Sequence, residues 1–310
     1  MSNSRKNTAN PKPTPFDHQT LMDALNHMSM QSSDVGIGYL GESILGKGIP
    51  MITLGHGKKE LLYVGAHHGM EWITSLLLVR FLRELQETLS HGRSIYGILP
   101  EQLFQSYTLY VIPMLNPDGV DYQIHGVDQS NPLYERVLQM NGKSSDFSHW
   151  QANARGVDLN HNYDAGFAEY KKMEAENGIL GGAPTRYSGE APESEPEVSA
   201  LCNFIRFHEN LCGVLTLHTQ GEEIFYGCSE KLPAHAYSVA KKLSMLSGYE
   251  LSQAVGMASC GGLTDWCAQV MGIPSFTVEC GRGKNPLPLS DAFPIYVRLR
   301  KLLFLFPTMF

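Results

Sequence analysis

The stretch Ala-His-His-Gly-Met-Glu-Trp-Ile, residues 66–73, lies where an apolar run gives way to a helical pattern. Residues 61–64 before it are apolar and predict a buried strand, and the apolar residues of 74–89 recur at helical spacing. We therefore expect a strand-to-helix loop that carries His68 and Glu71, three residues apart. Both side chains can then face one point.

An imidazole nitrogen and a carboxylate oxygen are ordinary ligands of Zn²⁺, and a catalytic zinc site needs three protein ligands with one position left open. His68 and Glu71 would supply two of the three. A His-x-x-Glu pair alone is weak evidence, because such pairs occur by chance in many proteins. A third ligand must come from another part of the chain.

Length and composition set the broad class. A chain of 310 residues with 43% hydrophobic content can bury the core of one large α/β domain or of two small ones. The 24 basic and 31 acidic residues give a net charge of −7, and no Lys/Arg run is present. Nucleic acid is therefore not an expected partner.

The chain shows no apolar segment suited to a membrane. Residues 1–16 are polar and contain prolines, which predicts a flexible tail rather than a signal peptide. No later run approaches the roughly 18 apolar residues of a membrane-spanning helix. We expect a cytoplasmic protein without a membrane partner, in which the six cysteines stay reduced.

Strand-like and helix-like segments alternate along the chain. This alternation predicts a largely parallel, twisted sheet with helices on both faces, and ligands of such sheets bind at the carboxyl ends of the strands. Strands are expected at 36–44, 50–54, 61–64, 107–113, 213–217 and 274–278, and helices at 17–30, 74–89, about 195–208 and 290–305.

Three polar segments allow structural interpretations. Ser194-Glu195-Pro196-Glu197 has the pattern of a capping box, with Ser194 as the helix N-cap. The string Asn-Pro-Asp-Gly at 116–119 favours a tight surface turn. Residues 150–164 are rich in side-chain amides and form either a solvated loop or a wall of a binding cleft.

Two more strand ends carry residues that could take part in chemistry. His218 follows the strand 213–217, and Glu279 follows the strand 274–278. Taken alone, each residue also allows a purely structural role. His218 could be a polar residue with its hydrogen bonds satisfied, and Glu279 could be a salt-bridge partner. In a parallel sheet both would open onto the same edge as His68. His218 is then the third metal ligand, and Glu279 is placed to accept a proton from an attacking water.

The ordered strings H-x-x-E, N-P-D-G, G-V-D-x-N-x-N, S-E-x-E, a strand-end H, G-G-x-x-D-W and F-T-x-E resemble the zinc metallocarboxypeptidase family over residues 38–305. The resemblance implies a single domain, here 17–310, with a central mixed and mostly parallel sheet of about eight strands flanked by helices. It also implies one Zn²⁺ per chain, held by His68, Glu71 and His218, with Glu279 as general base. Asn160 is similar to the family's asparagine that binds the terminal carboxylate of the substrate.

Departures from the digestive carboxypeptidases point to a branch of the family. Their arginines and tyrosine are replaced by residues that cannot form the same carboxylate clamp: Met70, Gln151, His161 and Met257. The segment W-Q-A-N-A-R-G-V-D-L-N-H-N-Y resembles instead the bacterial branch that cleaves the γ-D-glutamyl bond to diaminopimelate or another diamino acid in cell-wall peptides.

Several side chains could then bind such a substrate. Arg155 would replace the cation lost at Gln151, either at the scissile carbonyl or on a carboxylate, and His161 would assist Asn160. Asp265 is a candidate for the ammonium, although it could equally cap the helix that begins there. Arg186 and Arg282 are further candidates.

The expected activity is therefore a zinc-dependent peptidase acting on small, muropeptide-like peptides. Two alternatives keep the same scaffold: a general carboxypeptidase of ordinary peptides, and a zinc-dependent deacylase. A non-catalytic binding protein would be expected to lack a ligand or the base, and all four residues are present. The sequence leaves the oligomeric state open.

Overall fold

The computed structural model describes residues 15–31, 36–227, 232–258 and 260–310. Of the tail expected at 1–16, residues 1–14 lie outside this description, whereas Phe16 is buried in the main hydrophobic core. The ordered core thus extends at least to Phe16, before the first helix.

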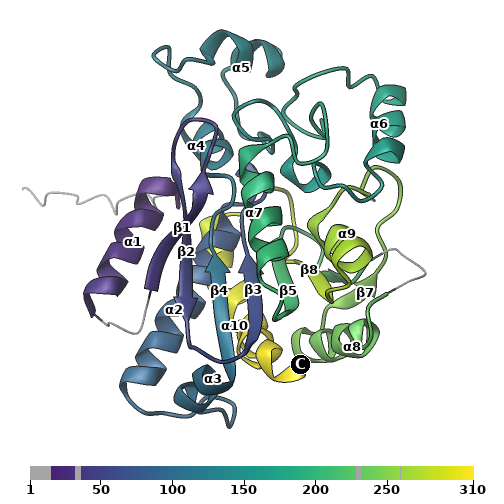
Figure 1. Ribbon diagram of the computed structural model, residues 1–310. Helices are drawn as coiled ribbons and strands as arrows, with labels where there is room; N and C mark the ends of the chain where they lie inside the picture. Colours follow the sequence, from purple (N-terminus) through teal and green to yellow (C-terminus); the bar gives the residue numbers. More distant parts are fainter. Residues whose placement is uncertain (1–14, 32–35, 228–231, 259) are drawn as a thin grey trace, which may run out of the picture.

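A single sheet of eight strands runs through the described part of the molecule, in the order β1-β2-β4-β3-β5-β8-β6-β7 (Figure 1). The strands are β1 (Gly36–Glu42), β2 (Gly48–Leu54), β3 (Lys59–Val64), β4 (Tyr107–Ile112), β5 (Leu211–His218), β6 (Glu223–Phe225), β7 (Glu250–Ser252) and β8 (Ser275–Glu279).

The central strands β4, β3, β5 and β8 pair in parallel, as do β6 and β7. The pairs β1–β2, β2–β4 and β6–β8 are antiparallel. The expected mixed and mostly parallel sheet is therefore confirmed. Because β3, β5 and β8 are parallel neighbours, their carboxyl ends meet at one edge.

Helices cover both faces of this sheet. The helices are α1 (His18–Gln31), α2 (Ile73–Ser90), α3 (Pro100–Ser106), α4 (Pro117–His125), α5 (Tyr134–Met140), α6 (Phe167–Glu176), α7 (Pro196–Phe207), α8 (Ala236–Ser247), α9 (Leu263–Trp266) and α10 (Ala292–Leu305). Helices α1, α2, α8 and α10 share the larger core on one face, and α7 and α9 share a second core on the other. Figure 1 shows α7 in front of the sheet, with α2 and α10 behind it.

Strand β3 shows how sequence decides these layers. Side chains alternate between the faces of a strand. Leu61 and Tyr63 accordingly pack into the larger core, and Leu62 and Val64 into the second one. All four are fully buried, which explains why the strand reads as a continuous apolar run.

Two local expectations were wrong. Asn116 does not open a surface turn: it is the buried N-cap of α4, and its side chain accepts a hydrogen bond from Gly119 N. Ser194 does not cap α7, whose N-cap is Glu195 without a side-chain cap bond. Instead Glu197 turns inward and accepts hydrogen bonds from Ile44 N and Asn153 Nδ2, so no capping box forms.

Cys202, Cys212, Cys267 and Cys280 are free thiols in the structure, and Cys228 lies outside the described residues. Among the helices in the described ranges, none combines the length and the apolar character needed to cross a membrane.

Candidate active site

Three potential metal ligands meet at the carboxyl edge of the sheet. His68 lies four residues beyond the end of β3, and a single 3₁₀ turn, Gly69–Glu71, carries Glu71 back toward it. His218 is the last residue of β5, the parallel neighbour of β3. All three side chains are buried, and their ligand atoms lie within 4.8 Å of one another.

The spacing of these atoms fits a tetrahedral ion. His68 Nδ1 lies 2.9 Å from Glu71 Oε1, and His218 Nδ1 lies 3.1 Å from Glu71 Oε2 and 3.3 Å from His68 Nδ1. Ligands bound at about 2.0–2.1 Å in tetrahedral geometry are about 3.3–3.4 Å apart. Two imidazoles and a carboxylate are also an ordinary donor set for catalytic zinc, so the residues present fit the ion.

Asp158 fixes the orientation of His68. Its Oδ1 lies 3.1 Å from His68 Nε2, and its Oδ2 accepts a hydrogen bond of 2.7 Å from Gln151 Nε2. A carboxylate on the far nitrogen of a ligating histidine selects the tautomer whose other nitrogen is free to bind metal. Asp158 therefore directs the Nδ1 lone pair of His68 toward Glu71 and His218.

The charges of this cluster shift its protonation equilibria. Burial alone would lower the pKa of His68, but the carboxylates of Glu71 and Asp158 raise it well above its ordinary value. Burial would raise the pKa of Glu71, but His68 and His218 hold it down, at about 2. The site thus keeps Glu71 ionised and favours a positive charge on His68, whereas burial lowers the pKa of His218.

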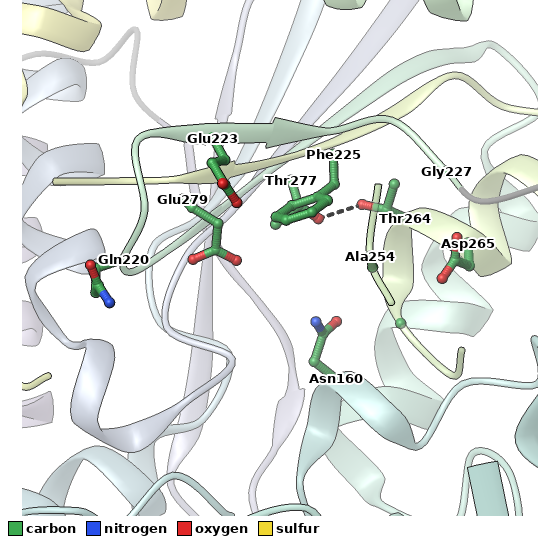
Figure 2. A pocket seen from close by; sticks show the side chains of 11 residues that line it. Asn160, Gln220, Glu223, Phe225, Gly227, Ala254, Thr264, Asp265, Thr277 and Glu279 are labelled. Carbon is green, nitrogen blue, oxygen red and sulfur yellow. Dashed lines mark hydrogen bonds between the residues drawn. The ribbon is translucent and has the colours of Figure 1, made fainter. Parts of the chain in front are cut away.

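Glu279 ends β8 and lies directly opposite His218 in the register of the β5–β8 pair. Figure 2 shows its carboxylate projecting into a cavity of about 290 Å³. Burial raises the pKa of Glu279 well above its ordinary value, and the nearby Glu71 adds to the effect. A carboxylate with a raised pKa at this position can take up a proton near neutral pH.

The cavity beside Glu279 also receives Asn160 and Asp265 from other elements (Figure 2). Asn160 Oδ1 accepts a hydrogen bond from Leu263 N, 3.2 Å away, which leaves its Nδ2 as the donor available to a ligand. Asp265 lies in the first turn of α9, whose N-cap is Gly262 rather than Asp265. The expected alternative that Asp265 caps this helix is therefore wrong.

Other expected binding residues are engaged elsewhere. Arg155 Nε contacts Glu195 Oε2 at 3.0 Å, and Arg155 lines a separate groove with Arg136 and Tyr187. It is thus not placed to polarise a carbonyl beside Glu279, and that expectation needs correction.

His161 is not placed as expected either. Its ring stacks on Tyr170 at a centroid distance of 4.0 Å, its Nδ1 contacts Cys260 O, and it is not among the residues that line the cavity. Burial lowers the pKa of His161 despite the neighbouring carboxylate of Asp158. A second donor beside Asn160 is not supported by these contacts.

Arg186 and Arg282 are both solvent-exposed, and neither lines this cavity. Arg282 Nε pairs with Glu222 Oε2 at 2.9 Å.

Some residues that shape the site were not singled out in the sequence. Asp158 lies inside the G-V-D-x-N string, yet its contact with His68 joins residues 90 positions apart. Asn116 Nδ2 donates a hydrogen bond to His67 O, 3.0 Å away, and thereby supports the loop before His68. The N-P-D-G string was the available signal for Asn116, and its interpretation as a surface turn concealed this role.

Fold and site together define an α/β metallohydrolase. The sequence model of the zinc carboxypeptidase family matches residues 21–297, which is most of the chain. The chain therefore belongs to the zinc carboxypeptidase family: it is a zinc metallopeptidase, and its cofactor is Zn²⁺.

Two of the curated relatives are named for different peptidase activities. The chain is 34% identical to gamma-D-glutamyl-L-diamino acid endopeptidase 1 of Lysinibacillus sphaericus, over 91% of this chain and 69% of the relative. It is 30% identical to carboxypeptidase B of Bos taurus, over 82% of this chain and 60% of the relative.

Solved structures support the fold. The carboxypeptidase A of Helicoverpa armigera superposes with a TM-score of 0.69 at 17% identity, covering 94% of this chain and 73% of the other. The murein-tripeptide amidase of Escherichia coli O157 gives a TM-score of 0.52 at 20% identity, covering 88% of this chain and 91% of the other.

Proposed function

We propose that this zinc peptidase hydrolyses the γ-D-glutamyl bond to a diamino acid, meso-diaminopimelate or Lys, in cell-wall peptides. The observation that carries the proposal is the cavity beside Glu279, which presents the Asn160 amide and several carboxylates in one small space. A terminal diamino acid carries both carboxylate and ammonium groups, and this lining complements both. The Lysinibacillus sphaericus relative, named for action at such a bond, supports the same substrate class.

In this proposal His68, Glu71 and His218 hold the Zn²⁺, and Asp158 keeps His68 in the ligating tautomer. Zinc supplies Lewis acidity, which polarises the scissile carbonyl and acidifies a water. Glu279 accepts the proton of the attacking water and returns it to the leaving amine. Asn160 Nδ2 donates to the terminal carboxylate and so positions the scissile bond.

The oxyanion is left without the arginine that the sequence suggested, because Arg155 is paired with Glu195. Zinc is then the main source of positive charge in the described site. That the enzyme acts in the cytoplasm, on small muropeptides, stays a prediction from the sequence.

The substrate is tested by incubating the purified protein with three peptides: L-Ala-γ-D-Glu-meso-diaminopimelate, its counterpart ending in Lys, and an α-linked peptide ending in Phe. Released amino acids are identified by mass spectrometry. We expect release from the γ-linked peptides alone. Preferential release of Phe would reject the proposal and favour a general carboxypeptidase. The sequence similarity to carboxypeptidase B favours this second candidate.

A further inference from the structure

A second carboxylate, that of Glu223, lies directly opposite Glu279 on the neighbouring strand. Glu223 begins β6 and is the direct register partner of Glu279 in the antiparallel β6–β8 pair. Directly opposite residues place their Cβ atoms about 4.5–5.5 Å apart on the same face of the sheet. Figure 2 shows both carboxylates projecting into the cavity of about 290 Å³.

This arrangement is costly whenever both carboxylates are ionised and no cation lies near them. Like charges directly opposite each other on paired strands are destabilising. The neighbouring Glu222 is paired with Arg282 Nε at 2.9 Å, whereas no hydrogen bond or ion pair joins the Glu223 carboxylate to any described residue. Glu223 is also only partly exposed, so solvent does not fully compensate it.

The size and lining of the cavity indicate which kind of cation could pair with Glu223. Its volume lies at the lower end of the roughly 300–1,000 Å³ typical of ligand pockets, which suits one amino-acid residue. Asn160 offers an amide donor to a carboxylate, and the ring of Phe225 forms an apolar wall beside Glu223 (Figure 2). A ligand that complements Asn160, Phe225 and Glu223 has a carboxylate, an aliphatic stem and an ammonium group.

We propose that Glu223 is a specificity-determining residue that binds the side-chain ammonium of the amino acid released by the enzyme. This inference rests on the proposed function for the location of the substrate, but it does not depend on the bond being γ-linked. Its consequence is a preference for Lys or diaminopimelate over a neutral residue of the same shape.

The test compares Lys with norleucine, which differ only in the terminal ammonium. Both are placed at the C-terminus of L-Ala-γ-D-Glu and of α-linked L-Ala-L-Glu, and kcat/KM is measured for wild type, Glu223→Gln and Glu222→Gln. Wild type should prefer Lys, and Glu223→Gln should lower the Lys/norleucine ratio about 10- to 100-fold, as expected for a hydrogen bond to a charged group. Glu222→Gln alters the ion pair with the exposed Arg282 outside the cavity, and it should keep the ratio of wild type.

The controls separate this inference from the proposed function. If only the α-linked peptides are cleaved, the γ-bond assignment fails, while the Lys/norleucine ratio still tests Glu223. A wild type without preference for Lys would overturn the role of Glu223, and this measurement needs no variant. An unchanged ratio in a Glu223→Gln enzyme with a full zinc equivalent would overturn it as well.

Discussion

At the scale of single residues, Asp158 links the loop after β3 to the polar segment that follows Trp150. Its Oδ1 contacts His68, and its Oδ2 accepts from Gln151 Nε2 and from Arg186 N. The side chain is fully buried, so these bonds have no competition from bulk water. Asp158 thereby acts on the metal through His68 rather than by direct contact.

We expect Asp158→Asn to weaken zinc affinity about 10- to 100-fold, the usual cost of losing a carboxylate behind a metal-bound histidine. Competition with a zinc-selective chelator measures this. Asp164→Asn is the matched control, because Asp164 lies in the same polar segment but is exposed. Equal zinc affinity of both variants would remove Asp158 from the metal site.

Glu197 is a second residue with a measurable effect, because its raised pKa makes the stability of the fold depend on pH. Burial raises its pKa from an ordinary 4.5 to about 8, and Glu195 and Asp118 contribute. Between these two pH values the unfolded chain loses the proton while the folded protein keeps it. This group therefore stabilises the fold less as pH rises through that window, and its unfavourable contribution is complete above about pH 8.

We expect Glu197→Gln to remove this dependence. Each pKa unit corresponds to about 1.4 kcal/mol, so the variant should gain about 2–4 kcal/mol in unfolding free energy over wild type between pH 5 and pH 8. Urea unfolding at several pH values gives the difference. The exposed Glu190→Gln should follow wild type, and a Glu197→Gln curve parallel to that of wild type would contradict the raised pKa.

At the scale of elements, the 3₁₀ turn Gly69–Glu71 packs closely against the start of α4. A Cβ on Gly69 would lie 2.2 Å from Gly119 O and 2.9 Å from Trp150 O. The backbone of α4 therefore fixes the position of the turn, and the turn fixes Glu71. Glycine is required here for close approach.

Gly69→Ala should displace the turn, cost about 1–3 kcal/mol as overpacking usually does, and weaken zinc binding through Glu71. Chemical denaturation and a zinc titration measure the two effects. In contrast, Gly181→Ala adds its Cβ where no atom lies within 4 Å, and should change neither. A Gly69→Ala protein with the stability and zinc affinity of wild type would refute the packing argument.

The elements differ in how far sequence alone predicts them. Strands β3, β5 and β8 are buried on both faces, so their apolar runs were visible, and the polar residues at or shortly after their carboxyl ends mark the sheet edge. The start of α7 was misinterpreted because the Ser194-to-Glu197 pattern does not show that the core captures Glu197. Asp158 and Glu223 act through partners distant along the chain, and local patterns carry no information about such pairings.

At the scale of the whole molecule, the site joins segments from residue 68 to residue 279 around one sheet edge. Zinc bound there to the folded state alone stabilises the fold by mass action, by about 2.7 kcal/mol at a free concentration of 100 times Kd. The ion thus acts as a crosslink between distant parts of the chain as well as a cofactor.

We expect removal of zinc by a chelator to lower the Tm of wild type by about 5–10 °C, because about 1 kcal/mol shifts the Tm of a large domain by about 2–4 °C. His218→Ala, which lacks one ligand, should bind almost no zinc, and its Tm should not respond to the chelator. Differential scanning calorimetry with elemental analysis tests both statements. A variant that retained a full zinc equivalent would show that His218 is not a ligand.

The most direct test of the account is the turnover of Glu279→Gln at defined zinc content, measured as release of diaminopimelate from L-Ala-γ-D-Glu-meso-diaminopimelate. The substitution keeps the shape of the side chain and removes the proton acceptor, while His68, Glu71 and His218 stay in place. The account predicts one zinc per chain and a loss of about 10²- to 10⁴-fold in kcat. Near wild-type kcat with full zinc would contradict the assignment of Glu279 as the general base.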